Sequence, residues 1–195
     1  MTPPFLQSPY SYVFWATYAA WVVPEFVDAL RRDGGGADHD ANSKYVLYAT
    51  FGVAAGVAFV LGFVAPEWAT FDAAAVPLFW VGIALQVGGA ALRWYTVALL
   101  GDAFSRTVTV SASQGVVDSG PYAVVRHPTY TAGVLLYVGL SLALGTWPGV
   151  AVTVPAVLAG YGHRIRVEER ALRRHLDGYD DYCDRTPYRL IPGVY

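Results

Sequence analysis

The chain carries too few charges for its size to be an ordinary water-soluble domain: of its 195 residues, 55% are hydrophobic and 14% are charged, against roughly a quarter charged in soluble domains. A small protein has too much surface to cover with so few charged groups, so these values and the mean hydropathy of +0.37 exclude most soluble classes and indicate a protein embedded in lipid. The net charge of −2 and the single cysteine, Cys183, give no reason to expect a nucleic-acid partner, an intramolecular disulfide or a bound metal.

Five apolar segments follow one another along the chain, and each is a predicted helix. The segments are residues 10–30, 45–65, 77–100, 129–146 and 150–164. A bilayer core needs about 20 helical residues, or a few less where the membrane thins or long side chains snorkel. The last two segments are short, and Trp147-Pro148-Gly149 predicts a tight turn that joins them into a hairpin. The sequence therefore predicts an all-α polytopic membrane bundle of about five transmembrane helices.

The basic residues fall on alternate sides of this five-span arrangement. The connections without any basic residue are 1–9, 66–76 and 147–149. All 13 basic residues lie in 31–44, 93–126 and 164–195. Cytoplasmic loops of membrane proteins carry an excess of lysine and arginine. The pattern predicts a multi-pass protein of the cell membrane with its N-terminus outside and its C-terminus in the cytoplasm.

We expect one integral membrane domain over residues 1–195. Residues 1–100 supply the three N-terminal spans, and residues 101–195 supply the helical hairpin and the catalytic core. The amphipathic tail that follows the hairpin is rich in tyrosine. It is expected to dock against the cytoplasmic face or to form part of a lid.

Charged and small residues inside the apolar segments suggest two helix contacts. Glu25 lies in the first segment and Arg93 in the third. Either each side chain snorkels to the membrane surface or the two form a buried ion pair, and both alternatives stay open. Gly52 and Gly56 have the spacing of a small-residue helix contact, which is a weak indication in a chain so rich in glycine.

The residues able to do chemistry gather in two segments, which the hairpin brings to the same membrane face. The first is 120–130, which contains Arg126-His127-Pro128, and the second is 164–169. Arginine at a membrane boundary and proline in the first turn of a helix also occur for structural reasons alone. Taken by itself, the first segment therefore fits a solvated boundary as well as a functional site.

Glu168 and Glu169 have a structural and a functional interpretation. Arg164 with Glu168, and Glu169 with Arg173, have the i,i+4 spacing of ordinary surface pairs. Both glutamates also lie about one helical turn beyond the last apolar segment, where ionisable groups are costly and tend to be functional. We favour a functional role for at least one of them, with Arg126 as a neighbour of Glu169 in depth.

Together these residues resemble the isoprenylcysteine carboxyl methyltransferase family. The resemblance rests on residues 120–130, the hairpin, Glu168-Glu169, Tyr179-x-x-Tyr182 and the ending Tyr188-Arg189-Leu190-Ile191-Pro192. The arginine-histidine-proline-x-tyrosine core is shared with phospholipid N-methyltransferases and sterol reductases. The resemblance covers the second half of the chain and implies a cytoplasm-facing S-adenosyl-L-methionine pocket, closed by the last two helices and the tail.

The family's cofactor contacts carry over to a set of residues in both segments. By position they are Gln114, Gly115, Val116, Val117, Tyr122, His127, Pro128, Thr129, Tyr130 and Glu169. Gln114 stands where family members often have histidine, and Ala132 stands where they often have glycine.

The resemblance also implies a substrate-holding arginine shortly before the second glutamate. The matching place falls on Ile165, with an arginine on either side, and of Arg164 and Arg166 we expect Arg166. The expected catalytic set is therefore Arg126, Arg166 and Glu168.

The implied activity is S-adenosylmethionine-dependent O-methylation of the carboxylate of a prenylcysteine or a similar lipid-linked acceptor. A carboxylate attacks a sulfonium methyl without a general base, so positioning is the main requirement. Arginines in a water-poor pocket meet that requirement, and aromatic side chains favour the sulfonium. Three alternatives stay open: N-methylation of a lipid amine, NADPH-dependent lipid reduction, and a non-catalytic membrane protein. A Rossmann methyltransferase is not expected, because no glycine-rich loop follows a predicted strand.

Overall fold

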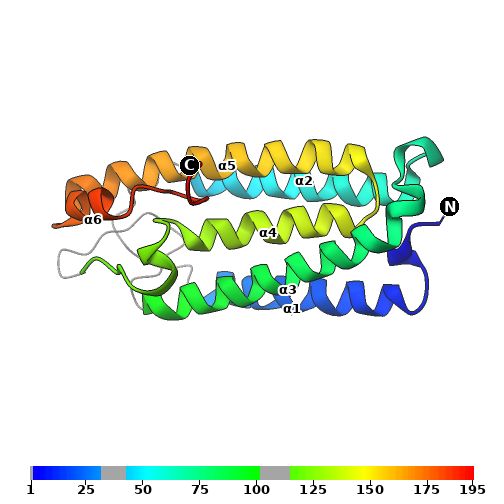
Figure 1. Ribbon diagram of the computed structural model, residues 1–195, viewed down its shortest axis with the longest axis horizontal. Helices are drawn as coiled ribbons and strands as arrows, with labels where there is room; N and C mark the ends of the chain where they lie inside the picture. Colours follow the sequence, from blue (N-terminus) through cyan, green and yellow to red (C-terminus); the bar gives the residue numbers. More distant parts are fainter. Residues whose placement is uncertain (1, 32–42, 102–114) are drawn as a thin grey trace.

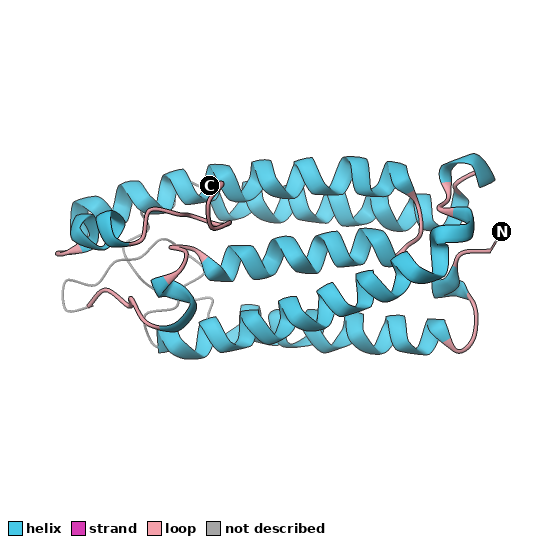
Figure 2. Cartoon of the chain, in the orientation of Figure 1, coloured by secondary structure: helices cyan, strands magenta, loops and turns pink. Residues whose placement is uncertain are grey.

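A computed structural model describes residues 2–31, 43–101 and 115–195, and every regular element in these ranges is a helix (Figures 1 and 2). The longer helices are α1 (Tyr10–Arg31), α2 (Ser43–Val64), α3 (Ala75–Leu100), α4 (Pro128–Ala143), α5 (Trp147–His175) and α6 (Tyr179–Arg185). The short 3-10 helices are η1 (Pro4–Leu6), η2 (Glu67–Ala69), η3 (Asp72–Ala74) and η5 (Gly120–Ala123). The predicted all-α fold is confirmed.

Helices α1 to α5 lie side by side along the long axis of the molecule, and successive helices run in opposite directions (Figure 1). The most extensive contacts join α3 to α4 and α2 to α5, and α4 also packs against α5. The 3-10 helices η1, η2 and η3 lie at the end that carries the N-terminus, whereas η5 and α6 lie at the opposite end. The polar elements of the second half of the chain therefore meet at one end of the bundle.

The helices follow the predicted apolar segments closely, except at the hairpin between α4 and α5. Trp147-Pro148-Gly149, predicted to be the turn, is the first turn of α5, where a proline has no intrahelical hydrogen bond to lose. The chain reverses instead over residues 144–146, where Gly145 has a φ of 84°. Helix α5 also runs past Arg164 to His175, so a single helix positions residues 164–169.

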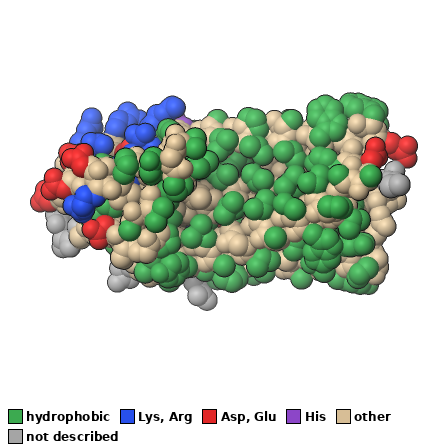
Figure 3. Space-filling view, in the orientation of Figure 1, with side chains coloured by type: hydrophobic (Ala, Val, Ile, Leu, Met, Phe, Trp, Pro, Cys, Tyr) green, Lys and Arg blue, Asp and Glu red, His purple; other side chains and the backbone are tan. Residues whose placement is uncertain are grey.

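In the part of the chain that the structure describes, two helices are long and apolar enough to cross a membrane by length and composition, Tyr45–Val64 and Asp72–Leu100, and Pro128–Ala143 is a shorter apolar helix. The exposed large hydrophobic side chains include Val53, Val60, Phe63, Trp80 and Val87. Figure 3 shows hydrophobic side chains along the shaft of the bundle, with most charged side chains gathered at the end that carries α6. An exposed apolar surface of this extent fits contact with a membrane.

The backbones of α3 and α4 touch, because glycines line their contact. An added Cβ at Gly82 would lie 2.6 Å from the carbonyl oxygen of Gly139, and one at Gly89 would lie 2.9 Å from that of Ala132. The contact expected at Gly52 and Gly56 does not form within the described ranges, since a Cβ at either glycine would meet nothing within 4 Å.

Glu25 and Arg93 form the ion pair that was one of two sequence-based alternatives. Arg93 Nε and Nη2 donate to the two carboxylate oxygens of Glu25 at 2.6 and 3.2 Å. One helical turn earlier on α1, Trp21 Nε1 donates to the Gln86 side-chain oxygen at 3.3 Å. Two polar contacts therefore join α1 to α3 within the apolar part of the bundle.

Candidate active site

The turn before α4 holds Arg126 and His127 inside the protein. Helix η5 buries Tyr122, whose hydroxyl donates to the carbonyl oxygen of Thr96 on α3 at 3.4 Å. The chain then enters α4 at Pro128. The Arg126 and His127 side chains are only 5% and 4% exposed, so they do not fit the interpretation of a solvated boundary.

Glu169 of α5 is the centre of a buried charge cluster. Its Oε1 accepts a hydrogen bond from Arg126 Nε at 2.9 Å and lies 3.4 Å from His127 Nε2. Its Oε2 accepts a hydrogen bond from Arg189 Nε at 3.0 Å. The structure thus brings together Arg126 and Glu169, which are 43 residues apart in the sequence.

The surroundings of Glu169 keep its carboxylate ionised. Burial alone would raise the pKa of Glu169, but the hydrogen bond and charge of His127, the charge of Arg126 and the hydrogen bond from Arg189 lower this pKa from 4.5 to about 2. The Glu169 carboxylate therefore stays negatively charged throughout the neutral pH range.

The phenols around the cluster stay protonated. Burial raises the pKa of the Tyr122, Tyr179 and Tyr182 hydroxyls above 10.0. Tyr182 uses its proton to donate to the carbonyl oxygen of Tyr122 at 2.7 Å, which ties α6 to η5. These side chains offer neutral hydrogen-bond donors and aromatic surface next to the charged groups.

A second polar group, formed by Tyr130, Arg164 and Glu168, lies beside the first. The Tyr130 hydroxyl donates to Glu168 Oε2 and accepts from Arg164 Nε at 3.4 Å. The Tyr130 ring stacks on His127, with centroids 5.5 Å apart and 12° between the planes, and on Tyr161 at 4.8 Å and 27°. The stacked rings therefore connect the two polar groups.

Residues 186–190, here called the C-terminal strap, lie across the turn before α4. The backbone N–H groups of Arg126 and His127 donate to the carbonyl oxygens of Tyr188 and Arg189, each at 2.9 Å. The N–H groups of Arg126 and His127 have no partner within a helix, and the strap supplies their acceptors. The strap covers the point where the chain enters α4.

Side chains fasten the strap on both sides of this turn. Arg126 Nη1 donates to the carbonyl oxygen of Thr186 at 3.1 Å, and Thr131 Oγ1 donates to that of Leu190 at 2.7 Å. Neither the role of Thr186 nor the bond from Arg189 to Glu169 was predicted from the sequence. The one indication there was Arg189 itself, a single arginine between two prolines in an otherwise largely apolar ending.

The remaining expected cofactor residues lie in two places. Pro128 and Thr129 form the buried first turn of α4. Gly115 is exposed and Val117 is partly buried, while Val116 packs against α6 and the end of α5. The buried residues of the cluster against which Val116 packs are Leu176, Tyr179, Tyr182 and Cys183. Gln114 lies outside the described residues.

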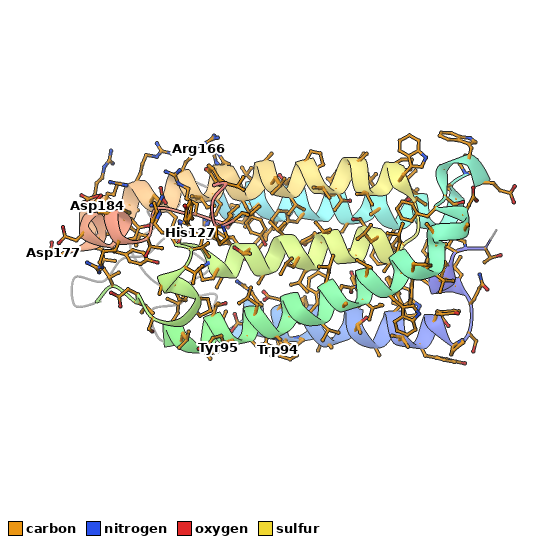
Figure 4. All side chains as sticks on the ribbon, in the orientation of Figure 1. Trp94, Tyr95, His127, Arg166, Asp177 and Asp184 are labelled. Atoms are coloured by element: carbon orange, nitrogen blue, oxygen red, sulfur yellow. The ribbon has the colours of Figure 1, made fainter. Side chains whose placement is uncertain are left out.

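Arg164 and Arg166 point to opposite sides of α5. Arg164 is 3% exposed and contacts Tyr130, whereas Arg166 is exposed. Figure 4 shows Arg166 on the outer side of α5 and His127 in the interior. The structure therefore brings Arg126, Arg164, Glu168 and Glu169 together and leaves Arg166 outside this group.

A family profile for phospholipid methyltransferases matches residues 77–177. The chain belongs to the phospholipid methyltransferase family. The matched residues include all of α4 and α5, most of α3, and Arg126, His127 and Glu169 of the buried cluster. Membership indicates a membrane methyltransferase, a class that generally uses S-adenosylmethionine.

A solved structure shares the fold of this family member. The eukaryotic intramembrane Ras methyltransferase, isoprenylcysteine carboxyl methyltransferase, superimposes with a TM-score of 0.66 at 24% identity, over 75% of this chain and 53% of that protein. The likeness shows the fold, in agreement with the resemblance found in the sequence.

Curated relatives have different described activities. The chain is 32% identical over 109 residues to a nickel-cobalt-cadmium resistance protein of Alcaligenes xylosoxydans xylosoxydans, with 55% of this chain and 50% of the relative covered. It is 30% identical over 95 residues to the Delta(14)-sterol reductase of Mus musculus, with 46% and 22% covered. It is 35% identical over 72 residues to a cobalt-zinc-cadmium resistance protein of Cupriavidus metallidurans, with 37% and 33% covered. The chain thus spans half or less of these relatives' lengths.

Proposed function

We propose that this family member is an S-adenosylmethionine-dependent O-methyltransferase that acts on the carboxylate of a prenylcysteine or a similar lipid-linked acid. The observation that carries the proposal is the buried cluster in which Arg126 and His127, from the turn before α4, meet Glu169 of α5. A buried ionised glutamate needs several partners to offset the cost of burial, and ionisable groups in membrane proteins tend to be functional. A buried carboxylate whose pKa is shifted by specific partners is typical of a functional site.

The residues around Glu169 fit the chemical groups of S-adenosylmethionine. The stacked rings of His127 and Tyr130 offer aromatic faces to a cationic sulfonium. The Tyr179 hydroxyl is buried and has no hydrogen-bond partner within the described ranges, beside the residue Val116 that the family resemblance assigns to the cofactor. An unpartnered buried hydroxyl is uncommon and suits an acceptor group of a bound molecule.

We assign the cofactor to the residues expected from the sequence, with Glu169 as the fixed anion among them. When bound, S-adenosylmethionine supplies a methyl group that an oxygen nucleophile accepts as the carbon–sulfur bond breaks, with no proton to remove. The protein's own contribution is positioning and exclusion of water. Arg126 donates one hydrogen bond to Glu169 and another to the carbonyl oxygen of Thr186 in the C-terminal strap, and it therefore positions both.

The acceptor carboxylate is assigned to Arg164 in preference to Arg166. Arg164 is buried beside Tyr130 and Glu168, where a low dielectric strengthens a charge-assisted hydrogen bond. Glu168 holds the Tyr130 hydroxyl and so keeps Arg164 oriented. Arg166 is exposed to solvent, and its charge is screened there.

The same proposal includes a membrane topology of five spans formed by α1 to α5, with the C-terminus in the cytoplasm. The distribution of all 13 basic residues supports it, as does the gathering of charges at the α6 end (Figure 3). A lipid-linked acceptor would then reach the buried cluster sideways from the bilayer.

The test is binding and turnover by the full chain in detergent. Calorimetry with S-adenosylhomocysteine should show binding that Glu169→Gln weakens at least about tenfold, since a hydrogen-bonded charge contributes about 1.5–3 kcal/mol. The matched control, Glu67→Gln, changes an exposed glutamate at the far end of the bundle and should bind normally. Transfer of a labelled methyl group to a short prenylated thiol acid should likewise be weakened by Glu169→Gln and left normal by Glu67→Gln. Absence of S-adenosylhomocysteine binding to the unaltered protein would refute the proposal.

Methylation of a lipid amine is the second candidate, because the matched family is that of phospholipid methyltransferases. An amine nucleophile has to lose a proton, so its rate should rise steeply with pH and phosphatidylethanolamine should be accepted. A carboxylate acceptor should show a nearly flat rate between about pH 6 and 9, well above a carboxylate pKa. The similarity to a sterol reductase is tested in the same samples by titrating NADPH, which should not bind.

A further inference from the structure

The outer face of α5 carries a row of basic residues beyond the proposed active site. His163, Arg166, Arg170 and Arg173 are spaced three, four and three residues apart, which places them on one side of a helix. They line a hollow of about 520 Å³ whose other lining residues are Glu169 and Arg189. We call it the α5 basic hollow. Figure 3 shows Lys and Arg side chains gathered on the α5 side of the charged end, and Asp and Glu nearer α6.

The positive charges of this hollow are only partly neutralised. Arg173 pairs with Asp180, and Arg189 pairs with Glu169. Within the described ranges no carboxylate lies within ion-pair distance of Arg166 or Arg170, and the Nε of Arg170 donates to the backbone carbonyl of Arg166. Two like charges at i,i+4 destabilise a helix slightly, and an anion bound between the two guanidinium groups would relieve this repulsion.

The hollow lies at the border between the apolar and the charged parts of the molecule. Val152 and Leu158, earlier on α5, expose 44% and 40% of their surface. At 1.5 Å per residue, Arg166 lies only about 12 Å along the helix axis from Leu158. If the apolar shaft occupies the bilayer core, Arg166 and Arg170 stand at the depth of the lipid phosphates.

We propose that the α5 basic hollow binds the phosphate group of an anionic membrane phospholipid. Two neighbouring guanidinium groups match the oxygens of a phosphate, with which arginine forms charge-assisted and often bidentate hydrogen bonds. The exposed Val152 and Leu158 lie on the side where acyl chains would run. The site is separate from the proposed methyl-transfer groups, but it shares Glu169 and Arg189 as a wall.

The shared wall links lipid binding to the active site. Arg189 belongs to the C-terminal strap and donates to Glu169 at 3.0 Å, and its side chain is 35% exposed toward the hollow. A phosphate bound there attracts the same guanidinium group that holds the strap. The lipid therefore acts on the strap from outside, without entering the buried cluster.

The experiment is native mass spectrometry of the full chain in detergent, titrated with dioleoylphosphatidylglycerol or dioleoylphosphatidylcholine. The unaltered protein should retain phosphatidylglycerol preferentially. Each of the two arginines that would contact the phosphate contributes about fivefold in affinity, so Arg166→Gln/Arg170→Gln should weaken phosphatidylglycerol binding about 30-fold. The matched control is Arg174→Gln, another exposed arginine of the same helix that does not line the hollow, and its affinity should stay within about twofold of that of the unaltered protein.

Three outcomes would overturn the proposal. One is equal retention of phosphatidylcholine and phosphatidylglycerol. Another is an equal loss in Arg174→Gln and the double variant, which would indicate only net charge. A third is full displacement of phosphatidylglycerol by equimolar inorganic phosphate, which would make the ligand a soluble anion. S-adenosylhomocysteine binding is measured on the same samples, and its persistence in the double variant separates this proposal from the proposed methyl transfer.

Discussion

Replacing Glu169 with glutamine should cost stability that depends on pH in a predictable way. The partners of Glu169 lower its pKa from 4.5 to about 2, and about 1.4 kcal/mol accompanies each pH unit of such a difference. The ionised carboxylate therefore contributes about 3 kcal/mol to folding. Because the folded-state pKa is the lower one, this contribution is complete above about pH 4.5 and disappears as the pH falls towards about 2.

The assay is equilibrium unfolding of the full chain in a mild detergent, followed by far-UV circular dichroism over a pH series. Near pH 7 the stability of the unaltered protein should exceed that of Glu169→Gln by about 3 kcal/mol, and the two stabilities should converge as the pH falls towards about 2. Glu67→Gln, at an exposed site, should change the stability by no more than about 1 kcal/mol at any pH, the range of exposed ion pairs. A difference that is absent near pH 7, or that persists unchanged into acid, would refute the interpretation of Glu169 as a paired, buried anion.

Three further predictions concern other contacts. Gly133→Ala should destabilise the protein by about 1–3 kcal/mol, because its Cβ would lie 1.8 Å from the Tyr161 hydroxyl oxygen; Gly52→Ala, in open space, should not lower the unfolding midpoint. Tyr130→Phe removes the hydroxyl between Glu168 and Arg164 and should lower kcat about tenfold, which corresponds to about 1.4 kcal/mol. The affinity for S-adenosylhomocysteine should stay nearly unchanged, and an equal loss of kcat and of this affinity would contradict the prediction. Glu25→Gln should destabilise the bundle, and Glu25→Arg combined with Arg93→Glu should recover more than half of that loss if the pair acts through charge; no recovery in unfolding experiments would argue against it.

The helices were predictable because long apolar runs leave few other structures for a membrane chain. Pro24 and Pro155 lie inside α1 and α5 without ending them. The long apolar runs therefore determined the helices in spite of these helix-breaking residues. The hairpin turn was misplaced by a few residues, since Trp147-Pro148-Gly149 suits the first turn of a helix as well as a tight turn. Gly145 was the better indication of the turn, because glycine readily adopts the positive φ that the chain has there.

The candidate site was predictable in its two segments but not in its details. The proline-opened α4 and the returning glutamates indicated that Arg126 and Glu169 would meet. The choice between Arg164 and Arg166 depends on how α5 is oriented about its own axis, because the side chains of residues two apart on a helix point about 200° away from each other. The C-terminal strap has no periodic pattern, so its backbone bonds to Arg126 and His127 appear only in three dimensions.

The glycine contact between α3 and α4 has a consequence for motion during turnover. Gly82 with Gly139, and Gly89 with Ala132, bring main chain against main chain at two heights, so neither sliding nor rotation of one helix against the other is possible without a collision. These two helices form a fixed wall, and His127 stands at its edge. Opening of a path for a bulky lipid therefore falls to elements outside this wall, above all α5, where Gly160 meets side chains of α2 and not its main chain.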